Sequence, residues 1–204
     1  MRVVTELPYW RSVVSGFGKP RIPVMPYVPN RREAPARVLE VPSGWKGIEN
    51  ILSDLIERFH ISTGACLEFG VEFGFSTVAL SSYFDHVVGV DTFQGDRHTI
   101  NHRNIYEETL NRLSGYDNIQ LVRSDYRTFI QNGQGSFGLI HVDIEHTFAD
   151  TFACGLWSAG HSQCTIFHDT ESFSQVRQAV VEIARVTGKK FFNFKESNGL
   201  GIVV

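Results

Sequence analysis

Acidic residues follow short apolar segments at five places in this sequence, namely Glu68, Asp91, Asp125, Asp143 and Asp169. Carboxylates can accept hydrogen bonds from hydroxyl groups, hold a hard cation or accept a proton. If the apolar segments are parallel strands, their carboxyl ends meet at one edge of a sheet, where open α/β folds bind ligands. The sequence therefore predicts one binding site lined by these acids, although each acid alone is also typical of a helix cap.

A glycine-containing segment, EFGVEFGFS at residues 68–76, follows the first apolar segment. A dinucleotide-binding loop has the spacing G-x-G-x-x-G and places a pyrophosphate on a helix N-terminus. Here Glu72 replaces the middle glycine and Glu68 precedes the loop, so two carboxylates would repel a pyrophosphate. They suit the cationic amino-acid end and the sulfonium of S-adenosylmethionine. We therefore expect S-adenosylmethionine rather than NAD, held by Glu68, Gly70, Glu72, Gly74 and Ser76.

Two later acids are candidates for the nucleoside part of this cofactor. Asp91 lies about twenty residues after Gly70, where such folds place a carboxylate that accepts both ribose hydroxyls. Ser124 and Asp125 follow the third apolar segment, and a side chain there can reach the amino group of adenine. The alternative for Asp125 is a helix cap.

The loop after Asp91 supplies further candidates. Thr92 and Phe93 come first, and we expect Phe93 to pack on the adenine. Asp96 and His98 lie farther along and could reach the acceptor. The alternative is a solvated surface loop.

Alternating periodicities predict the elements that position these residues. The expected strands are 65–69, 86–91, 119–122, 137–143 and 164–169, followed by a hairpin of 190–194 and 200–204. The expected helices are 45–59, 76–84, 105–113, 126–131, 148–157 and 173–184. Five β/α units predict a doubly wound, Rossmann-like α/β sheet, which the C-terminal antiparallel hairpin extends to seven strands. We interpret His141, inside a strand, as structural.

The N-terminal part has a different composition. All seven prolines lie between Pro8 and Pro42. Proline fixes φ and lacks a backbone donor, so we predict an extended arm over residues 1–44 and a single domain over residues 45–204. The arm is either a tail on the surface, or a lid or subunit contact over the active site; the last would make the protein a homo-oligomer.

The composition excludes several classes of protein. The chain has 204 residues and a formal net charge of −3, which provides no basic field for nucleic acid or an anionic membrane. No apolar run is long enough to span a bilayer, and the N-terminus has no long apolar region of a secretory signal. Cys66, Cys154 and Cys164 lie in apolar contexts. We expect a reduced, cytoplasmic protein with neither nucleic-acid nor membrane partners.

Four blocks together resemble a known family: LEFGVEFGFST, VDTFQGDRH, LIHVDIEHTFADTFACGLW and IFHDTESFSQVRQAV. They are similar to class I S-adenosylmethionine-dependent methyltransferases, in the group that contains sugar and small-molecule O-methyltransferases. The resemblance covers about residues 45–204 and implies a hydroxylated small-molecule acceptor. The family's Asp-Gly-Asp-His-like block is Asp143-Ile144-Glu145-His146 here. This change supports one alternative, a non-catalytic adenosylmethionine-binding module.

Methyl transfer to a hydroxyl requires removal of its proton by a base or with help from a metal. We expect His146 to be the base, because the unperturbed pKa of histidine lies near neutrality. Asp143, Asp169 and Glu145 are the candidate Mg²⁺ ligands. We also expect Asp143 and Asp169 to form the catalytic group with His146 and His168, and Asp143 to contact the cofactor. His168 either assists catalysis or is a histidine whose partners are structural. In the metal-free alternative, these groups only bind the substrate; a third hypothesis, a nicotinamide-dependent oxidoreductase, is disfavoured by the glycine spacing.

Overall fold

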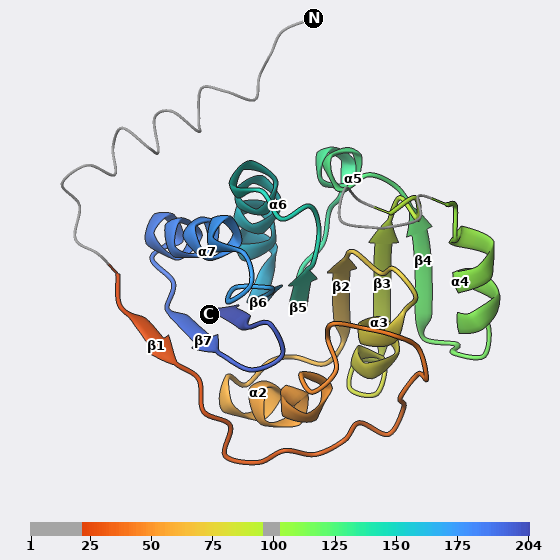
Figure 1. The fold of residues 1–204 in the computed structure, drawn as a ribbon, viewed down its shortest axis with the longest axis horizontal. Coiled ribbons are helices and arrows are strands. Elements are labelled where there is room, and N and C mark those ends of the chain that lie inside the picture. Colours follow the sequence, from red (N-terminus) through yellow and green to blue (C-terminus); the bar gives the residue numbers. More distant parts are fainter. Residues whose placement is uncertain (1–21, 96–102) are drawn as a thin grey trace, which may run out of the picture.

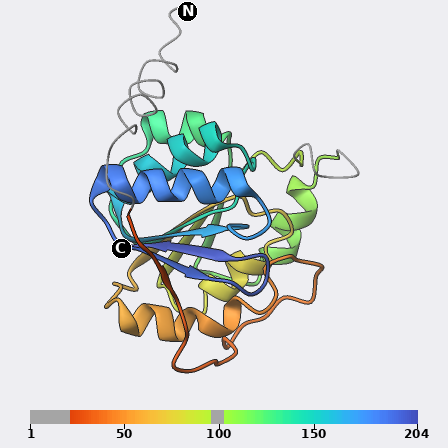
Figure 2. The same ribbon diagram turned by 60° about the vertical axis from the view of Figure 1, so that its left-hand side comes forward.

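The computed structural model describes residues 22–95 and 103–204, and these form one sheet with helices on both faces (Figures 1 and 2). The strands are β1 (Val24–Pro26), β2 (Ala65–Phe69), β3 (His86–Asp91), β4 (Ile119–Arg123), β5 (Phe137–Val142), β6 (Ser162–His168), β7 (Phe191–Phe194) and β8 (Leu200–Val203). The helices are η1 (Glu49–Ile51), α2 (Leu52–Arg58), α3 (Phe75–Leu80), α4 (Tyr106–Leu113), α5 (Tyr126–Asn132), α6 (Phe148–His161) and α7 (Ser174–Thr187). Asp96 and His98 lie outside the described residues.

The sheet has the strand order β1-β7-β8-β6-β5-β2-β3-β4. Strand β8 pairs antiparallel with both β6 and β7, whereas the other pairs are parallel. The predicted doubly wound sheet with a C-terminal antiparallel hairpin is therefore confirmed. The chain leaves β2 toward β3 and β4 and later returns to β5 on the other side of β2. This reversal is a topological switch point, where open α/β sheets bind ligands.

The sheet has one strand more than the seven predicted, because the arm contributes β1. Residues Val24–Pro26 pair in parallel with β7 at the edge of the sheet. A proline can join a sheet at an edge, where a missing N–H donor costs little. Just after β1, Tyr27 is buried and its hydroxyl donates a 2.5 Å hydrogen bond to Asp54. This part of the arm is thus packed on the fold, while the domain division at residue 44 stays a prediction.

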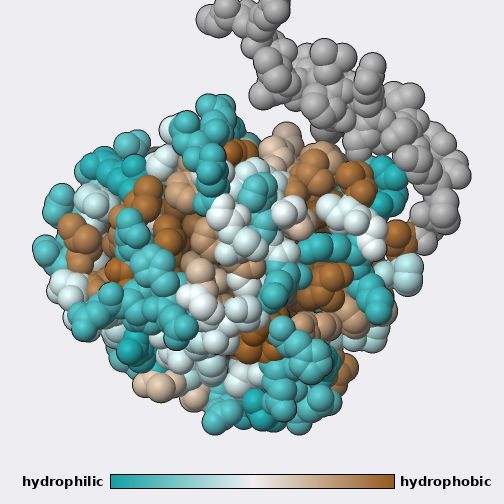
Figure 3. All heavy atoms as spheres, turned by 180° about the vertical axis from the view of Figure 1, so that it is seen from behind, coloured by the Kyte–Doolittle hydropathy of each residue, from teal (hydrophilic) through white to brown (hydrophobic). Residues whose placement is uncertain are grey.

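Two apolar layers cover the sheet because successive strand residues face opposite sides. On β2, Cys66 faces the layer of α2 and α3, whereas Leu67 and Phe69 face the layer of α6 and α7. Figure 2 shows these helices above and below the sheet. Seen from behind, brown apolar residues form groups among hydrophilic ones (Figure 3). Among the described residues, no helix has the length and apolar character needed to cross a bilayer.

The first predicted helix begins later than expected. Residues 44–48 form turns, and helical structure starts with η1 at Glu49. Gly47 has φ +103°, a conformation that does not continue a helix. The segment before η1 is consequently free to turn toward the carboxyl ends of the strands.

Candidate active site

A cavity of about 1110 Å³ lies at the carboxyl ends of the strands. Its lining comes from the arm, from the loops after β2, β3, β4, β5 and β6, and from the turn between β7 and β8. The sequence-predicted residues that line it are Gly70, Glu72, Ser76, Asp91, Thr92, Phe93, Ser124, Asp125, Asp143, Glu145, His146, His168 and Asp169. The predicted gathering of strand-end residues at one edge is therefore observed, but their roles as ligands of cofactor or metal stay predictions.

The loop after β2 requires glycine where it passes β5. Gly70 has φ +92°, and a Cβ atom on it would lie 1.7 Å from the carbonyl oxygen of Asp143. Gly74 has φ +89°, but a Cβ there would meet the side chain of Leu113 on α4, not the cavity. Gly74 therefore shapes the turn into α3, and its predicted contact with the cofactor is not supported by its position.

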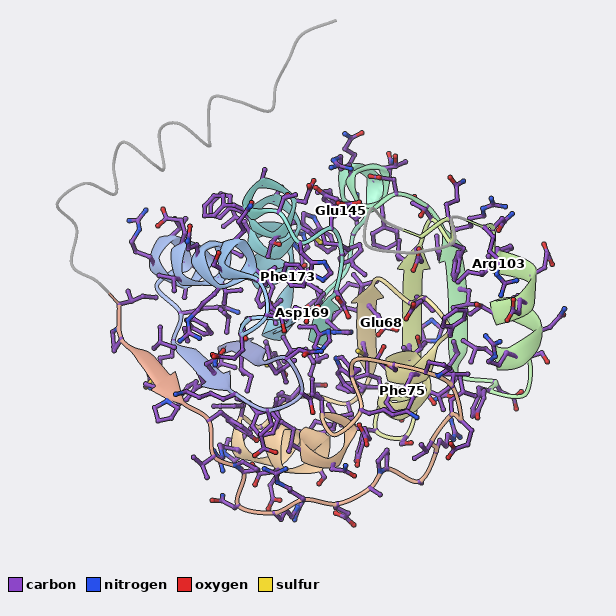
Figure 4. The ribbon with its side chains drawn as sticks, in the orientation of Figure 1. Glu68, Phe75, Arg103, Glu145, Asp169 and Phe173 are labelled. Carbon is purple, nitrogen blue, oxygen red and sulfur yellow. The ribbon has the colours of Figure 1, made fainter. Side chains whose placement is uncertain are left out.

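Glu68 is the main departure from the predicted site. Its side chain is fully buried, on β2 (Figure 4), and does not line the cavity. Its Oε1 lies 2.8 Å from Nδ1 of His141, and the hydroxyl of Thr77 donates to Oε2. Strand alternation turns Glu68 toward the layer of α2 and α3, below the strand end. Glu68 therefore does not face the cavity, and its predicted contact with the cofactor is not supported by its position.

Asp91 connects two loops of the cavity. Its Oδ2 accepts backbone hydrogen bonds from Val71 at 2.8 Å and Glu72 at 2.9 Å, and its Oδ1 accepts one from Phe93 at 2.7 Å. Oδ2 therefore already accepts two hydrogen bonds, and Oδ1 keeps one lone pair for a ligand hydroxyl. Phe93 itself is 1 % exposed and packs on Tyr106 at a ring distance of 5.1 Å.

Asp125 caps a helix, which was the alternative to its predicted contact with adenine. It is the N-cap of α5, where its side chain accepts from the backbone N–H of Arg127 at 2.7 Å. The Arg127 guanidinium also lies 3.0 Å from the carboxylate. The predicted adenine contact of Asp125 would have to share the carboxylate with these partners.

Four residues from the ends of β5 and β6 converge at the other side of the cavity. His168 Nδ1 lies 3.0 Å from Asp143 Oδ2, and His146 Nε2 lies 2.8 Å from Asp169 Oδ2. A 3.6 Å contact between His146 Nε2 and Asp143 Oδ1 links the two pairs. Asp169 has φ +64°, an uncommon conformation for a residue with a side chain. The sequence predicted these four residues as the catalytic group, and the structure brings them together.

Comparison with known proteins identifies the family. Residues 67–182 match the model of a family described as a methyltransferase domain, which is more than half of the chain. The chain belongs to this methyltransferase family. The match runs from β2 into α7. It therefore includes the strand-end residues of the cavity, namely Asp91, Asp143, His146, His168 and Asp169. Searching curated protein sequences gives no match.

Solved structures support the class I methyltransferase fold. The O-methyltransferase from Bacillus cereus in complex with SAH has a TM-score of 0.56 at 13% identity, covering 100% of this chain and 91% of that chain. The O-methyltransferase TomG from Streptomyces achromogenes, in complex with SAM, has 0.53 at 13%, covering 74% and 75%. Fibrillarin from Aeropyrum pernix, with natively bound S-adenosyl-L-methionine, has 0.51 at 11%, covering 71% and 67%. The recognition from sequence is confirmed: the protein is a class I S-adenosylmethionine-dependent methyltransferase.

The ionisation of the methyltransferase's Asp–His group differs from the expectation. Burial alone would raise the pKa of Asp143, but the charge of His168 and contacts with both histidines hold it well below its usual range. Burial would lower the pKa of His146, yet contacts with Asp143 and Asp169 raise it to about 10. His146 is therefore protonated at neutral pH in this arrangement, so the near-neutral pKa assumed for a general base is wrong here.

His168 of the methyltransferase has partners on both ring nitrogens. Besides the Asp143 contact, its Nε2 lies 3.2 Å from the backbone carbonyl oxygen of Ser197 in the β7–β8 turn. Burial opposes protonation, but the charge of Asp143 raises the pKa of His168. The alternative interpretation of His168, a histidine that bridges strands, fits this geometry, and its effect on chemistry would be to orient Asp143.

A divalent cation would fit a donor set that differs from the predicted one. Asp143, His146 and Asp169 each offer one ligand atom, and these atoms lie within 4.8 Å of one another. Two carboxylate oxygens and one imidazole nitrogen suit Mg²⁺ less than Mn²⁺ or another first-row metal ion. Glu145 lines the cavity but is not in this group. His146, and not Glu145, lies beside Asp143 and Asp169 in this structure.

Sequence analysis left open whether the arm reaches the site and did not place the β7–β8 turn there. Residues 42–45, where the arm joins the domain, line the cavity, as does Asn198 in the β7–β8 turn. Trp45 lies three residues after the last proline, and the sequence pattern predicts it only as the start of the helix 45–59. The Asn198-Gly199 pair predicts a turn, but it does not indicate that this turn lies at the cavity. These contributions depend on which strand ends the two segments approach.

Proposed function

We propose that this methyltransferase transfers the methyl group of S-adenosylmethionine to a hydroxyl group of a sugar or other small molecule. The observation that carries the proposal is the single cavity that joins the Gly70 and Asp91 loops to the group of Asp143, His146 and Asp169. A cofactor over the two loops would point its sulfonium toward that group. Gly70 lines the cavity, and the loop can take this path because only a glycine fits beside the carbonyl oxygen of Asp143.

The charges around the cavity favour an acceptor without negative charge. Seven carboxylate side chains line it: Glu72, Asp91, Asp125, Asp143, Glu145, Asp150 and Asp169. The lining arginines are already paired, Arg103 with Glu108 at 2.8 Å and Arg127 with Asp125 at 3.0 Å. A phosphorylated acceptor, or a nucleic-acid backbone, would be repelled. We therefore propose a neutral hydroxylated small molecule and no nucleic-acid partner.

The geometry favours His146 for handling the acceptor's proton. Its ring stacks on Phe173 with 4.2 Å between centroids and 9° between planes, which fixes the direction of Nε2. His146 must first lose its own proton. The positive charge that the cofactor's sulfonium brings into the cavity favours this loss, because like charges repel. Asp143 and Asp169 would then hold the imidazolium that forms when His146 accepts the hydroxyl proton. In-line positioning of the two reactants supplies much of the remaining acceleration.

As an alternative to His146 acting as the base, we propose that Asp143, His146 and Asp169 hold a divalent cation. Such an ion, when bound, lowers the pKa of a coordinated hydroxyl. In that case the three side chains would orient the acceptor's hydroxyl group through the ion, in addition to binding the acceptor.

Metal addition tests this donor set. At a hundredfold excess over Kd, Mn²⁺ should stabilise the EDTA-treated protein by about 2.7 kcal/mol and raise Tm by about 5–10 °C. Asp169→Asn should remove the shift, whereas Glu145→Gln should retain it. Differential scanning fluorimetry with MnCl₂ and MgCl₂ measures both variants. A shift that is absent from the native protein, or that disappears only in Glu145→Gln, would contradict the proposed ligands.

Calorimetry followed by turnover tests the function itself. We expect adenosylhomocysteine to bind in the micromolar range, NADH not to bind, and radiolabelled methyl groups to reach a neutral sugar or polyphenol in an acceptor panel. Binding of NADH without adenosylhomocysteine would contradict the proposal. Tight binding without turnover on the whole panel would instead favour the non-catalytic module.

A further inference from the structure

A chain of buried hydrogen bonds runs beneath the cavity and has no role in the proposed proton transfer. Trp45, 2 % exposed, donates its indole N–H to His141 Nε2 at 3.1 Å. His141 Nδ1 lies 2.8 Å from Glu68 Oε1, and the Thr77 hydroxyl donates to the other Glu68 oxygen. His141, Glu68 and Thr77 are fully buried. The chain therefore connects the arm to β5, β2 and α3.

The chemistry of Trp45 sets the direction of every bond in this chain. An indole nitrogen can only donate, so His141 Nε2 must be the acceptor. Nδ1 then carries the hydrogen of the neutral ring and donates it to Glu68. The carboxylate accepts from His141 on one oxygen and from Thr77 on the other. All the buried polar atoms of the chain are satisfied only while the Trp45 N–H is in place.

The chain lies at the topological switch point of the sheet. Glu68 on β2 and His141 on β5 are paired in register, and these two strands flank the point where the winding reverses. Ligands of open α/β sheets bind just beyond the strand ends at this place. Trp45 is the last residue of this hydrogen-bond chain on the side of the cavity, and it also lines the cavity.

Further contacts hold the arm segment 42–45 against the cavity. Ser43 Oγ accepts the backbone N–H of Trp45 at 3.1 Å. The Ser197 hydroxyl donates to the carbonyl oxygen of Lys46 at 2.7 Å, which joins the arm to the β7–β8 turn. The four residues of the segment all line the cavity, so its wall moves if the segment moves.

We propose that Trp45 forms a wall of the adenosylmethionine site and that His141, Glu68 and Thr77 are positioning residues that hold it there. The inference rests on the proposed function, which places the cofactor in this cavity. Glu68 then affects the cofactor through Trp45 and not by direct contact. The arm becomes part of the binding site.

Trp45→Phe tests the proposal because it removes the N–H donor and retains an aromatic ring. Adenosylhomocysteine Kd should rise roughly tenfold in calorimetry below the variant's unfolding transition, as His141 loses its partner and the wall loosens. Trp157→Phe is the matched control. Trp157 is half-buried on α6, packs on Phe69 and lies outside the cavity lining, so its replacement should leave Kd unchanged.

Two further measurements separate positioning from simple stability. The change in tryptophan fluorescence on adding adenosylhomocysteine should persist in Trp157→Phe and disappear in Trp45→Phe. Thr77→Val breaks the far end of the chain with Trp45 intact, and should raise Kd about threefold. Wild-type Kd in folded Trp45→Phe and Thr77→Val, with only a lower Tm, would overturn the inference. If the native protein does not bind adenosylhomocysteine, the proposed function fails as well.

Discussion

Gly70→Ala is expected to destabilise the methyltransferase by about 2–5 kcal/mol and to abolish adenosylhomocysteine binding. The new Cβ atom would lie 1.7 Å from the carbonyl oxygen of Asp143, and φ at this position is +92°. Because the colliding atom belongs to the backbone, no side-chain rotation relieves the overlap. Either the loop after β2 or the loop after β5 must move, and both line the cavity. Urea unfolding followed by circular dichroism, together with calorimetry, measures the two effects.

The chain offers a matched control for this glycine. Gly64 precedes β2, and a Cβ atom there would have nothing within 4 Å. Gly64→Ala should change the free energy of unfolding by no more than about 0.5 kcal/mol and leave binding intact. If Gly70→Ala bound adenosylhomocysteine as tightly as Gly64→Ala does, the loop after β2 would not be the cofactor loop.

Asp143→Asn is expected to lower methyl transfer by about 10²–10⁴-fold. The amide keeps the shape of the side chain but loses the charge that faces His168 at 3.0 Å and His146 at 3.6 Å. Without that charge, His146 has only Asp169 to stabilise its protonated form, and the proposed cation loses a ligand. The measurement is kcat/KM for radiolabelled methyl transfer to the acceptor found in the panel.

The interpretation of this loss depends on binding and on a control acid. Adenosylhomocysteine affinity of Asp143→Asn should stay within a few-fold of the native value, so that the defect lies in turnover. Asp85→Asn replaces an exposed acid before β3 and should retain full activity. Normal turnover by both Asp143→Asn and His146→Gln would show that the acceptor's proton leaves by another route.

The local sequence pattern was sufficient to predict the parallel strands at the centre of the sheet. The segment 137–142 is almost wholly apolar because β5 is covered on both faces, and such a run predicts a central strand without further information. The C-terminal hairpin was likewise predicted from two apolar runs and a turn. Strand β1 was not, because Pro23 before it and Pro26 within it argue against a strand, and its pairing depends on the free edge of β7.

Residue type was a weaker guide to the direction of a side chain. Glu68 and Asp91 are both acids near strand ends, yet only Asp91 reaches the cavity. Glu68 stands one residue earlier in its strand than the last position, and alternation turns it onto His141. Glu145 and His146 are neighbours, and the path of the loop after β5 brings the histidine, not the glutamate, to Asp169.

The sequence by itself determined the order of strands and helices, the glycine loop after β2, and the acids at the end of β3 and just beyond β5 and β6. Each of these depends on periodicity and residue type within a few positions. The tertiary structure alone decided that the arm closes the cavity through Trp45, that His146 pairs with Asp169, and that His146 has a raised pKa. Those features arise where distant segments meet, and the distance between two charges or a donor and an acceptor is set by the packing of the whole fold.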